Sequence, residues 1–311
     1  MPEAPGRGRT AGRIPRGDAL LLVVAVAAVS TSAPLVRGAE APSLAIAFWR
    51  NALAVPVLGA GVLARGPRRR ELRSLDRRTR RLTVVAGALL AAHFATWVPS
   101  LALTSVASSV ALVATQPAWA ALIARWRGRP VPRGAWWGIA VAMAGAVLLG
   151  GVDLSSSPRA LSGDLLALLG GLLAAAYVTV GAEVRRTAST TAYALGCYAT
   201  AAVVLGLVCA AGRQPLVGYD GRTWLLLAAT VAGPQLLGHT VINRVVATVG
   251  PVTVSVAILF EIVGAAILAW AAFGELPPAS AVPAALCIAG GVVLVVRAGA
   301  GPPAPPVPGS D

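Results

Sequence analysis

The sequence predicts an all-α, polytopic membrane protein in which ten transmembrane helices form two inverted five-helix repeats. Of its 311 residues, 57% are apolar and only 12% are charged, whereas a soluble domain has about twice that charged fraction. Apolar runs of about 18 or more residues recur along the chain, and each can cross a bilayer core of about 30 Å. The chain also resembles itself at an interval of about 145 residues. Together these observations predict a duplicated membrane fold.

The apolar runs are expected to be helices, because backbone polar groups in lipid must be satisfied within their own segment. The ten expected spans are about 19–36, 44–64, 82–103, 104–124, 135–152, 163–182, 190–211, 223–243, 250–272 and 278–297. The first span also resembles a signal peptide, since arginines precede it and "GAEA" at 38–41 offers small residues for cleavage. We favour a membrane helix, because the repeat requires one there.

The basic residues predict the orientation of the chain. All 26 are arginine. With the N-terminus placed in the cytoplasm, 21 arginines fall on the inner side and four on the outer side, which is the positive-inside pattern. This pattern explains the net charge of +14 without nucleic acid as a partner. It predicts a multi-pass protein of the bacterial plasma membrane with both termini cytoplasmic, and contact of the segment 65–81 with anionic lipid headgroups.

The repeat divides the chain into two domains with a tail at each end. Residues 18–153 form the first five-helix repeat and residues 154–297 the second. Because five is odd, the second copy enters the membrane from the opposite face, a pattern seen in secondary transporters. The Pro- and Gly-rich tails, 1–17 and 298–311, are expected to be disordered.

Several motifs resemble the EamA type of the drug/metabolite transporter superfamily, which is built from two five-helix repeats. "FWRNALA" is similar to the family's signature in helix two, and "TSVASSVALVATQPAWAALIA" to its motif in helix four. "GDLLALLGGLLAAAYVTVG" resembles the start of the second repeat, and "LFEIVGAAILAWAAFGE" the helix-nine motif. The resemblance covers about 18–297 and implies helices five and ten at the periphery, with a cavity among the others.

Two positions depart from the family pattern. Family members often have Pro after the helix-nine Glu, where this chain has Ile262, and this departure argues against a helix break near 261. Family members often have Gly-Glu after helix four, where this chain has Arg129 and Pro130.

Two histidines are the strongest candidates for a binding site, because they occupy equivalent positions in the two repeats. His93 and His239 are the only histidines, and each has a larger side chain four residues on, Trp97 and Asn243. Residues four apart share one helix face, so the two faces can meet as one substrate-binding site. Alternatively, each histidine hydrogen-bonds across a helix interface and does nothing else.

Gln116 and Glu261 form a second equivalent pair and complete the candidate site together with Tyr177. Glu261 lies about 16 Å along its helix from Gly250, near the middle of the bilayer. Three roles for it stay open, namely binding an ammonium group, carrying a proton or forming a structural ion pair.

Arg50 lies well inside the second span, where a charge costs about 3 kcal/mol or more if it faces lipid. It could attract a substrate carboxylate, pair with Glu261 or backbone carbonyls, or extend its side chain to the outer surface. We favour a structural role.

The predicted function is a secondary transporter, with export expected, that moves a small metabolite such as an amino acid by alternating access. A small-molecule substrate and a coupling proton are the expected partners, and a homodimer is compatible with the sequence. We expect no cofactor, no metal and no catalytic residue, since Cys197, Cys209 and Cys287 lack metal-ligand spacing and no Walker A motif is present. The alternative is an intramembrane enzyme acting on lipid-linked substrates.

Overall fold

The computed structural model describes residues 15–104, 106–150, 157–273 and 280–299. Every regular element in these ranges is helical. The two tails that the sequence predicts to be disordered lie mostly outside the described residues. The first helix nevertheless begins at Arg16 and the last ends at Gly299, so each extends two residues into an expected tail.

The first half of the chain contributes a series of helices, several of which are pieces of one predicted span. They are α1 (Arg16–Ser30), α2 (Ser32–Gly38), α3 (Ser43–Ala52), α4 (Ala54–Leu63), α5 (Gly66–Ser74), α6 (Arg77–Leu103), α7 (Val106–Val113), α8 (Gln116–Trp126) and α9 (Arg133–Gly150).

The second half follows the same plan and contains one π-helical segment, η1. Its elements are α10 (Pro158–Val184), α11 (Thr190–Ala211), α12 (Gly221–Thr230), η1 (Val231–His239), α13 (Thr240–Val249), α14 (Pro251–Ile258), α15 (Phe260–Phe273) and α16 (Ala281–Gly299). Within the described ranges, seven helices or helix runs are long and apolar enough to cross a membrane. The multi-pass membrane fold is therefore confirmed, and the count of ten crossings stays a prediction.

Helix interruptions occur at equivalent places in the two halves. The fourth predicted span breaks at Ala114 and Thr115, where Pro117 has no N–H to donate. The ninth breaks at Leu259, 145 residues after Ala114, so the expectation of no break near 261 is wrong. The N–H of Leu259 donates to the Val256 carbonyl (3.1 Å) and that of Ile262 to the Leu259 carbonyl (3.2 Å). These tight turns interrupt the helix without a proline.

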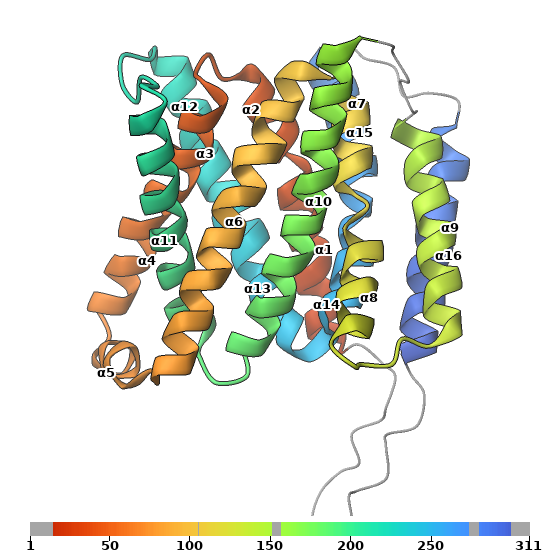
Figure 1. Ribbon diagram of the computed structural model, residues 1–311, viewed down its shortest axis with the longest axis horizontal. Coiled ribbons are helices and arrows are strands. Elements are labelled where there is room, and N and C mark those ends of the chain that lie inside the picture. Colours follow the sequence, from red (N-terminus) through yellow and green to blue (C-terminus); the bar gives the residue numbers. More distant parts are fainter. Residues whose placement is uncertain (1–14, 105, 151–156, 274–279, 300–311) are drawn as a thin grey trace, which may run out of the picture.

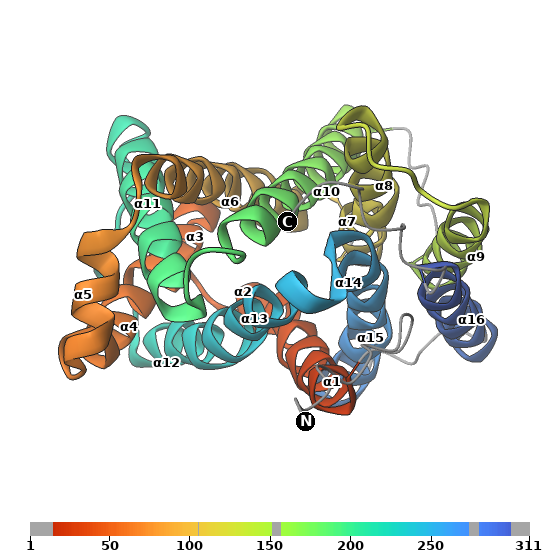
Figure 2. The same cartoon turned by 90° about the horizontal axis from the view of Figure 1, so that it is seen from below.

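Glycines decide how closely the long helices approach each other. A Cβ atom on Gly138 of α9 would lie 2.7 Å from the carbonyl oxygen of Gly291 on α16. The two helices therefore pack backbone to backbone and stand as a pair at one edge of the bundle (Figures 1 and 2). The other helices surround the centre (Figure 2), and among them α6 and α10 lie side by side along their lengths (Figure 1).

The arginine-rich segment 65–81, which lies between the second and third predicted spans, is mostly helical. Helix α5 lies across the bundle axis and is seen end-on in Figure 1. Helix α6 begins at Arg77, about one turn earlier than expected, because the Asp76 side chain accepts a hydrogen bond from the Thr79 N–H (2.9 Å). The hydrogen bonds from Thr79 also lower the pKa of the Asp76 carboxyl below its ordinary value.

Segments that the sequence assigns to the inner side meet at one end of the molecule. Glu183, at the end of α10, lies within 3.2 Å of Arg78, 3.5 Å of Arg129 and 3.7 Å of Arg186. The side chain of Glu71 on α5 accepts a hydrogen bond from the Ser189 N–H (2.6 Å). We call this end of the bundle, which is lower in Figure 1, the arginine-rich face.

Candidate functional site

A small cavity of about 60 Å³ lies at the centre of the bundle, between the two halves of the chain. We call it the central cavity. Most of its wall is apolar, and both interrupted helices contribute to it at their breaks, through Ala114 and Leu259. All but one of the seven predicted substrate-binding residues line it, namely His93, Trp97, Gln116, Tyr177, His239 and Glu261. The fold therefore brings together residues that are far apart in sequence.

His93 and Trp97 project from one face of α6 into this cavity. Their rings are stacked, with centroids 5.9 Å apart and an interplanar angle of 3°. Nδ1 of His93 lies 2.9 Å from the Gly170 carbonyl oxygen on α10. Because a carbonyl only accepts, the proton is assigned to Nδ1, which leaves Nε2 as an acceptor in the neutral ring.

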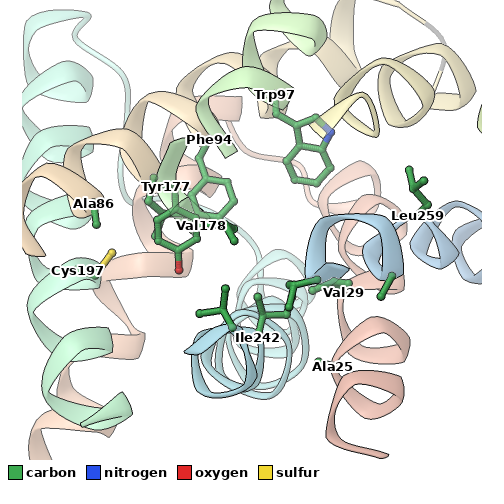
Figure 3. Close-up of a cluster of buried hydrophobic side chains, with 14 of the residues drawn as sticks. Ala25, Val29, Ala86, Phe94, Trp97, Tyr177, Val178, Cys197, Ile242 and Leu259 are labelled. Carbon is green, nitrogen blue, oxygen red and sulfur yellow. The ribbon is translucent and has the colours of Figure 1, made fainter. Parts of the chain in front are cut away.

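The indole N–H of Trp97 is a buried donor without a hydrogen-bond partner among the described residues. The side chain is only 4% exposed, and Figure 3 shows its ring projecting into the central space between the surrounding helices. A buried donor left unpaired costs about 1–3 kcal/mol. A ligand with an acceptor group would recover that free energy.

His239 and Asn243 occupy different places, although the repeat relates the pair to His93 and Trp97. His239, at the end of η1, lines the cavity beside Phe94 (ring centroids 5.6 Å apart) and Tyr177 (6.4 Å). Asn243 is not among the lining residues. Its side-chain oxygen accepts a hydrogen bond from the Tyr177 hydroxyl (2.8 Å), so it holds Tyr177 from behind the cavity wall.

Gln116 and Glu261 differ in the contacts they make. Nε2 of Gln116 donates to the Ser255 hydroxyl (2.9 Å), which joins α8 to α14. Glu261 lines the cavity, and no hydrogen bond or ion pair of its carboxyl is found within the described part of the chain. The acid therefore faces the cavity without a fixed partner.

Arg50 lies outside the central cavity and is fully buried, with 0% of its surface exposed, so an extended conformation toward the outer surface is excluded. Nε donates to Oε1 of Gln235 (3.0 Å), and Nη1 to the Ser32 hydroxyl (3.3 Å). The guanidinium carbon lies 3.9 Å above the Phe94 ring, a cation–π contact. Its partners among the described residues are therefore an amide, a hydroxyl and an aromatic ring, and Glu261 is not hydrogen-bonded to it.

Gln235 belongs to this network, and its role was not predicted from the sequence. Its Nε2 donates to Oδ1 of Asn51 (3.0 Å), and its backbone carbonyl accepts hydrogen bonds from Tyr198 and Thr240 (both 3.2 Å). It lies in η1 directly after Pro234, which has no N–H to donate, and its carbonyl also accepts the backbone N–H of Thr240. The sequence does contain one signal for Gln235, namely an uncharged amide that follows a proline in the middle of a predicted membrane span.

The fold and the cavity define the class of the protein. The two halves of the chain, with helix interruptions at Ala114 and at Leu259, enclose a buried cavity that polar side chains line. This architecture is typical of membrane transporters. The family model described as "EamA-like transporter family" matches residues 16–151 and again 161–297. The chain therefore belongs to the EamA-like transporter family, as the sequence motifs indicate.

Comparison with solved structures supports the fold. One similar structure, titled "Crystal structure of protein", has a TM-score of 0.74 and 21% sequence identity, over 90% of this chain and 96% of that one. At that identity the likeness shows the fold alone. Comparison with curated proteins finds no match.

Proposed function

We propose that this protein is a secondary transporter that exports a small metabolite, such as an amino acid, by alternating access. The observation that carries the proposal is the buried central cavity between the two repeats, which the side chains of Trp97, His239 and Glu261 face without hydrogen-bond partners among the described residues. An indole donor suits an acceptor group of the substrate, and a carboxylate suits an ammonium group. The apolar remainder of the wall suits a hydrocarbon body.

The size of the cavity supports a mechanism in which the two halves move. About 60 Å³ holds a few water molecules and is far below the 300–1,000 Å³ of a typical ligand pocket. The substrate must therefore enter when the halves separate on one side. The helix breaks at Ala114 and Leu259 line the cavity and give each half a place to bend. No observation favours the alternative of an intramembrane enzyme.

The transported compound can be identified by comparing metabolites in the medium of cells that overexpress the gene and of cells that lack it. Overexpression should enrich one small amine-containing compound outside the cells, and its loss should lower the same compound. The Glu261→Gln variant, expressed at the same level, serves as the control for an indirect effect of membrane-protein overexpression. If neither overexpression nor loss of the wild-type gene changes the concentration of any metabolite in the medium, the proposal is contradicted.

We predict that His93→Ala and His239→Ala each reduce transport about tenfold while the protein still inserts and folds. His239→Ala is the cleaner test, since His239 makes no hydrogen bond among the described residues, whereas His93 also holds the Gly170 carbonyl. Transport into vesicles and elution from a gel-filtration column measure the two effects. Thr83→Ala, a buried change on α6 outside the cavity, should leave transport unchanged. Normal transport by both histidine variants would remove them from the site.

The orientation of the chain is part of the same proposal. We propose that the arginine-rich face is cytoplasmic, that both termini lie on that side, and that the membrane is the bacterial plasma membrane. A cysteine at Ser74, exposed at the end of α5, is then expected to resist a membrane-impermeant thiol reagent in intact cells. A cysteine at Val217, 70% exposed in the loop between α11 and α12, should react. The opposite labelling pattern would invert the orientation.

The start of α6 supports the proposed contact with anionic lipids. Arg77, Arg80 and Arg81 line an open groove together with Val84 and Val85 one turn farther along. A phosphate group at the arginines would place an acyl chain along the valines, since consecutive turns are 5.4 Å apart. Arginines near the membrane surface each contribute about 1 kcal/mol to such binding.

A further inference from the structure

A second cavity of about 240 Å³ lies next to the central cavity, toward the arginine-rich face. We call it the lower cavity. Helix α8 lines the central cavity with Gln116 and the lower cavity with Ala120 and Ala124, which lie on one helix face because they are four residues apart. Helices α10 and α14 likewise line both cavities. The two cavities therefore lie along one seam between the same three helices.

One hydrogen bond crosses this seam where the cavities adjoin. Gln116 of α8 donates to the Ser255 hydroxyl of α14 (2.9 Å), and both residues are buried and line the central cavity. On α14 the lining changes from Ser255 to Thr253 and Val252 within one turn. The Gln116–Ser255 bond thus lies at the end of the central cavity that is nearer to the lower cavity.

The lower cavity is suited to an anionic group. Arg127 lines it and makes no ion pair or side-chain hydrogen bond with the described residues, whereas the neighbouring Arg129 is 3.5 Å from Glu183. Among the described residues, none of those lining the cavity is acidic. Gly250 and Pro251, at the N-terminus of α14, also line it, and a helix N-terminus carries a partial positive charge.

The backbone around the seam allows α8 and α14 to move apart. Helix α8 is separated from α7 at Ala114 and Thr115, and α14 from α15 at Leu259. At its other end, α14 follows Gly250, whose φ of +88° is a conformation that glycine adopts readily. Both helices can therefore tilt without carrying the rest of their spans with them.

We propose that the lower cavity is a loading site for the carboxylate end of the substrate, held by Arg127, and that the Gln116–Ser255 hydrogen bond is the gate to the central cavity. This inference rests on the proposed transport function. It adds a second binding position, a residue that recognises the anionic group and a gate between the two positions.

The charge preference of the lower cavity can be tested without knowing the substrate. In a variant with Cys197, Cys209 and Cys287 replaced by alanine, a cysteine is placed at Thr253 and labelled from the arginine-rich face of inverted vesicles. A sulfonate-bearing methanethiosulfonate should react faster than a trimethylammonium-bearing one. Arg127→Gln should lower the ratio of the two rates about fivefold. Arg125→Gln removes the same charge two residues earlier, from the last turn of α8 and outside the cavity, and should change the ratio less than twofold.

The gate can be tested with the same reagents and a cysteine at Ala114 in the central cavity. Ser255→Ala should raise its labelling rate from the arginine-rich face about fivefold, since one hydrogen bond contributes about 1 kcal/mol. Ser109→Ala removes a comparable buried bond, to Ser100 (2.6 Å) between α7 and α6, and should leave the rate unchanged.

Equal effects of Arg127→Gln and Arg125→Gln would overturn the loading site. Equal effects of Ser255→Ala and Ser109→Ala, or no effect of Ser255→Ala, would overturn the gate. Because both experiments measure thiol labelling and not transport, these failures are distinguishable from failure of the proposed function. If wild-type protein gives the expected labelling pattern but transports nothing, the proposed transport function fails while the anion-selective lower cavity and its gate stand.

Discussion

Glu261→Gln is expected to reduce proton-driven accumulation of the substrate more than tenfold. Exchange of substrate between equal pools should continue. Glutamine keeps the shape of the side chain but cannot bind and release a proton. The carboxyl lines the central cavity, and the equivalent residue of the other repeat is the neutral Gln116. Hydrogen bonding alone therefore does not require an acid at 261. Reconstituted vesicles with and without an imposed pH gradient measure the two activities.

The structure also predicts that Glu261→Gln folds normally. Arg50 donates its hydrogen bonds to Gln235 and Ser32. Replacing the Glu261 carboxyl therefore breaks no hydrogen bond of Arg50. The melting temperature should change by less than about 2 °C, an effect of a few tenths of a kcal/mol. Glu261→Asp, which keeps the titrating group one methylene farther back, should retain part of the accumulation. Unchanged accumulation and unchanged pH response in Glu261→Gln would show that the charge is not used.

Arg50→Ala is expected to cause the largest loss of stability, about 3 kcal/mol. The change opens a cavity against the Phe94 ring and leaves the buried Gln235 and Ser32 side chains without their donor. Because Arg50 comes from the first repeat and Gln235 from the second, the variant should also loosen the contact between the halves. The fraction of folded protein after heating in detergent measures the effect, and Arg81→Ala on the exposed face of α6 is the matched control.

Two further variants identify the partner of Arg50. Gln235→Leu should reproduce most of the loss, and its combination with Arg50→Ala should destabilise less than the sum of the two, since the residues are in contact. The double variant Arg50→Gln/Glu261→Gln should be no more stable than Arg50→Gln alone. Recovery of stability in that double variant would instead identify Glu261 as the partner.

Local composition is sufficient to predict the class of fold. Each span can be predicted from its own run of apolar residues. The side of the membrane on which the segment 65–81 lies can be predicted from the arginines of that segment. The repeat then relates His93 to His239 and Gln116 to Glu261 by position alone. These four residues do line one cavity, although their role in binding stays a prediction.

Which side chain of a helix faces the cavity depends on how that helix is rotated by its neighbours. Trp97 and Asn243 are equivalent in the repeat, yet Trp97 lines the cavity, while Asn243 lies behind the wall and binds Tyr177. The asymmetry arises because η1 inserts a π-helical segment before Asn243, and α6 has no corresponding change. The sequence of either helix alone does not contain this information.

The sequence by itself determined the membrane class, the duplicated architecture and the family, because insertion into a bilayer depends on hydropathy summed over each segment and on charges beside it. Only the tertiary structure decided the partner of Arg50, which is Gln235, 185 residues away, and the position of the break at Leu259. Such contacts depend on the tilt, rotation and interruption of several helices at once. Those quantities are set by packing among all helices and by the requirement that each freed backbone group finds a partner.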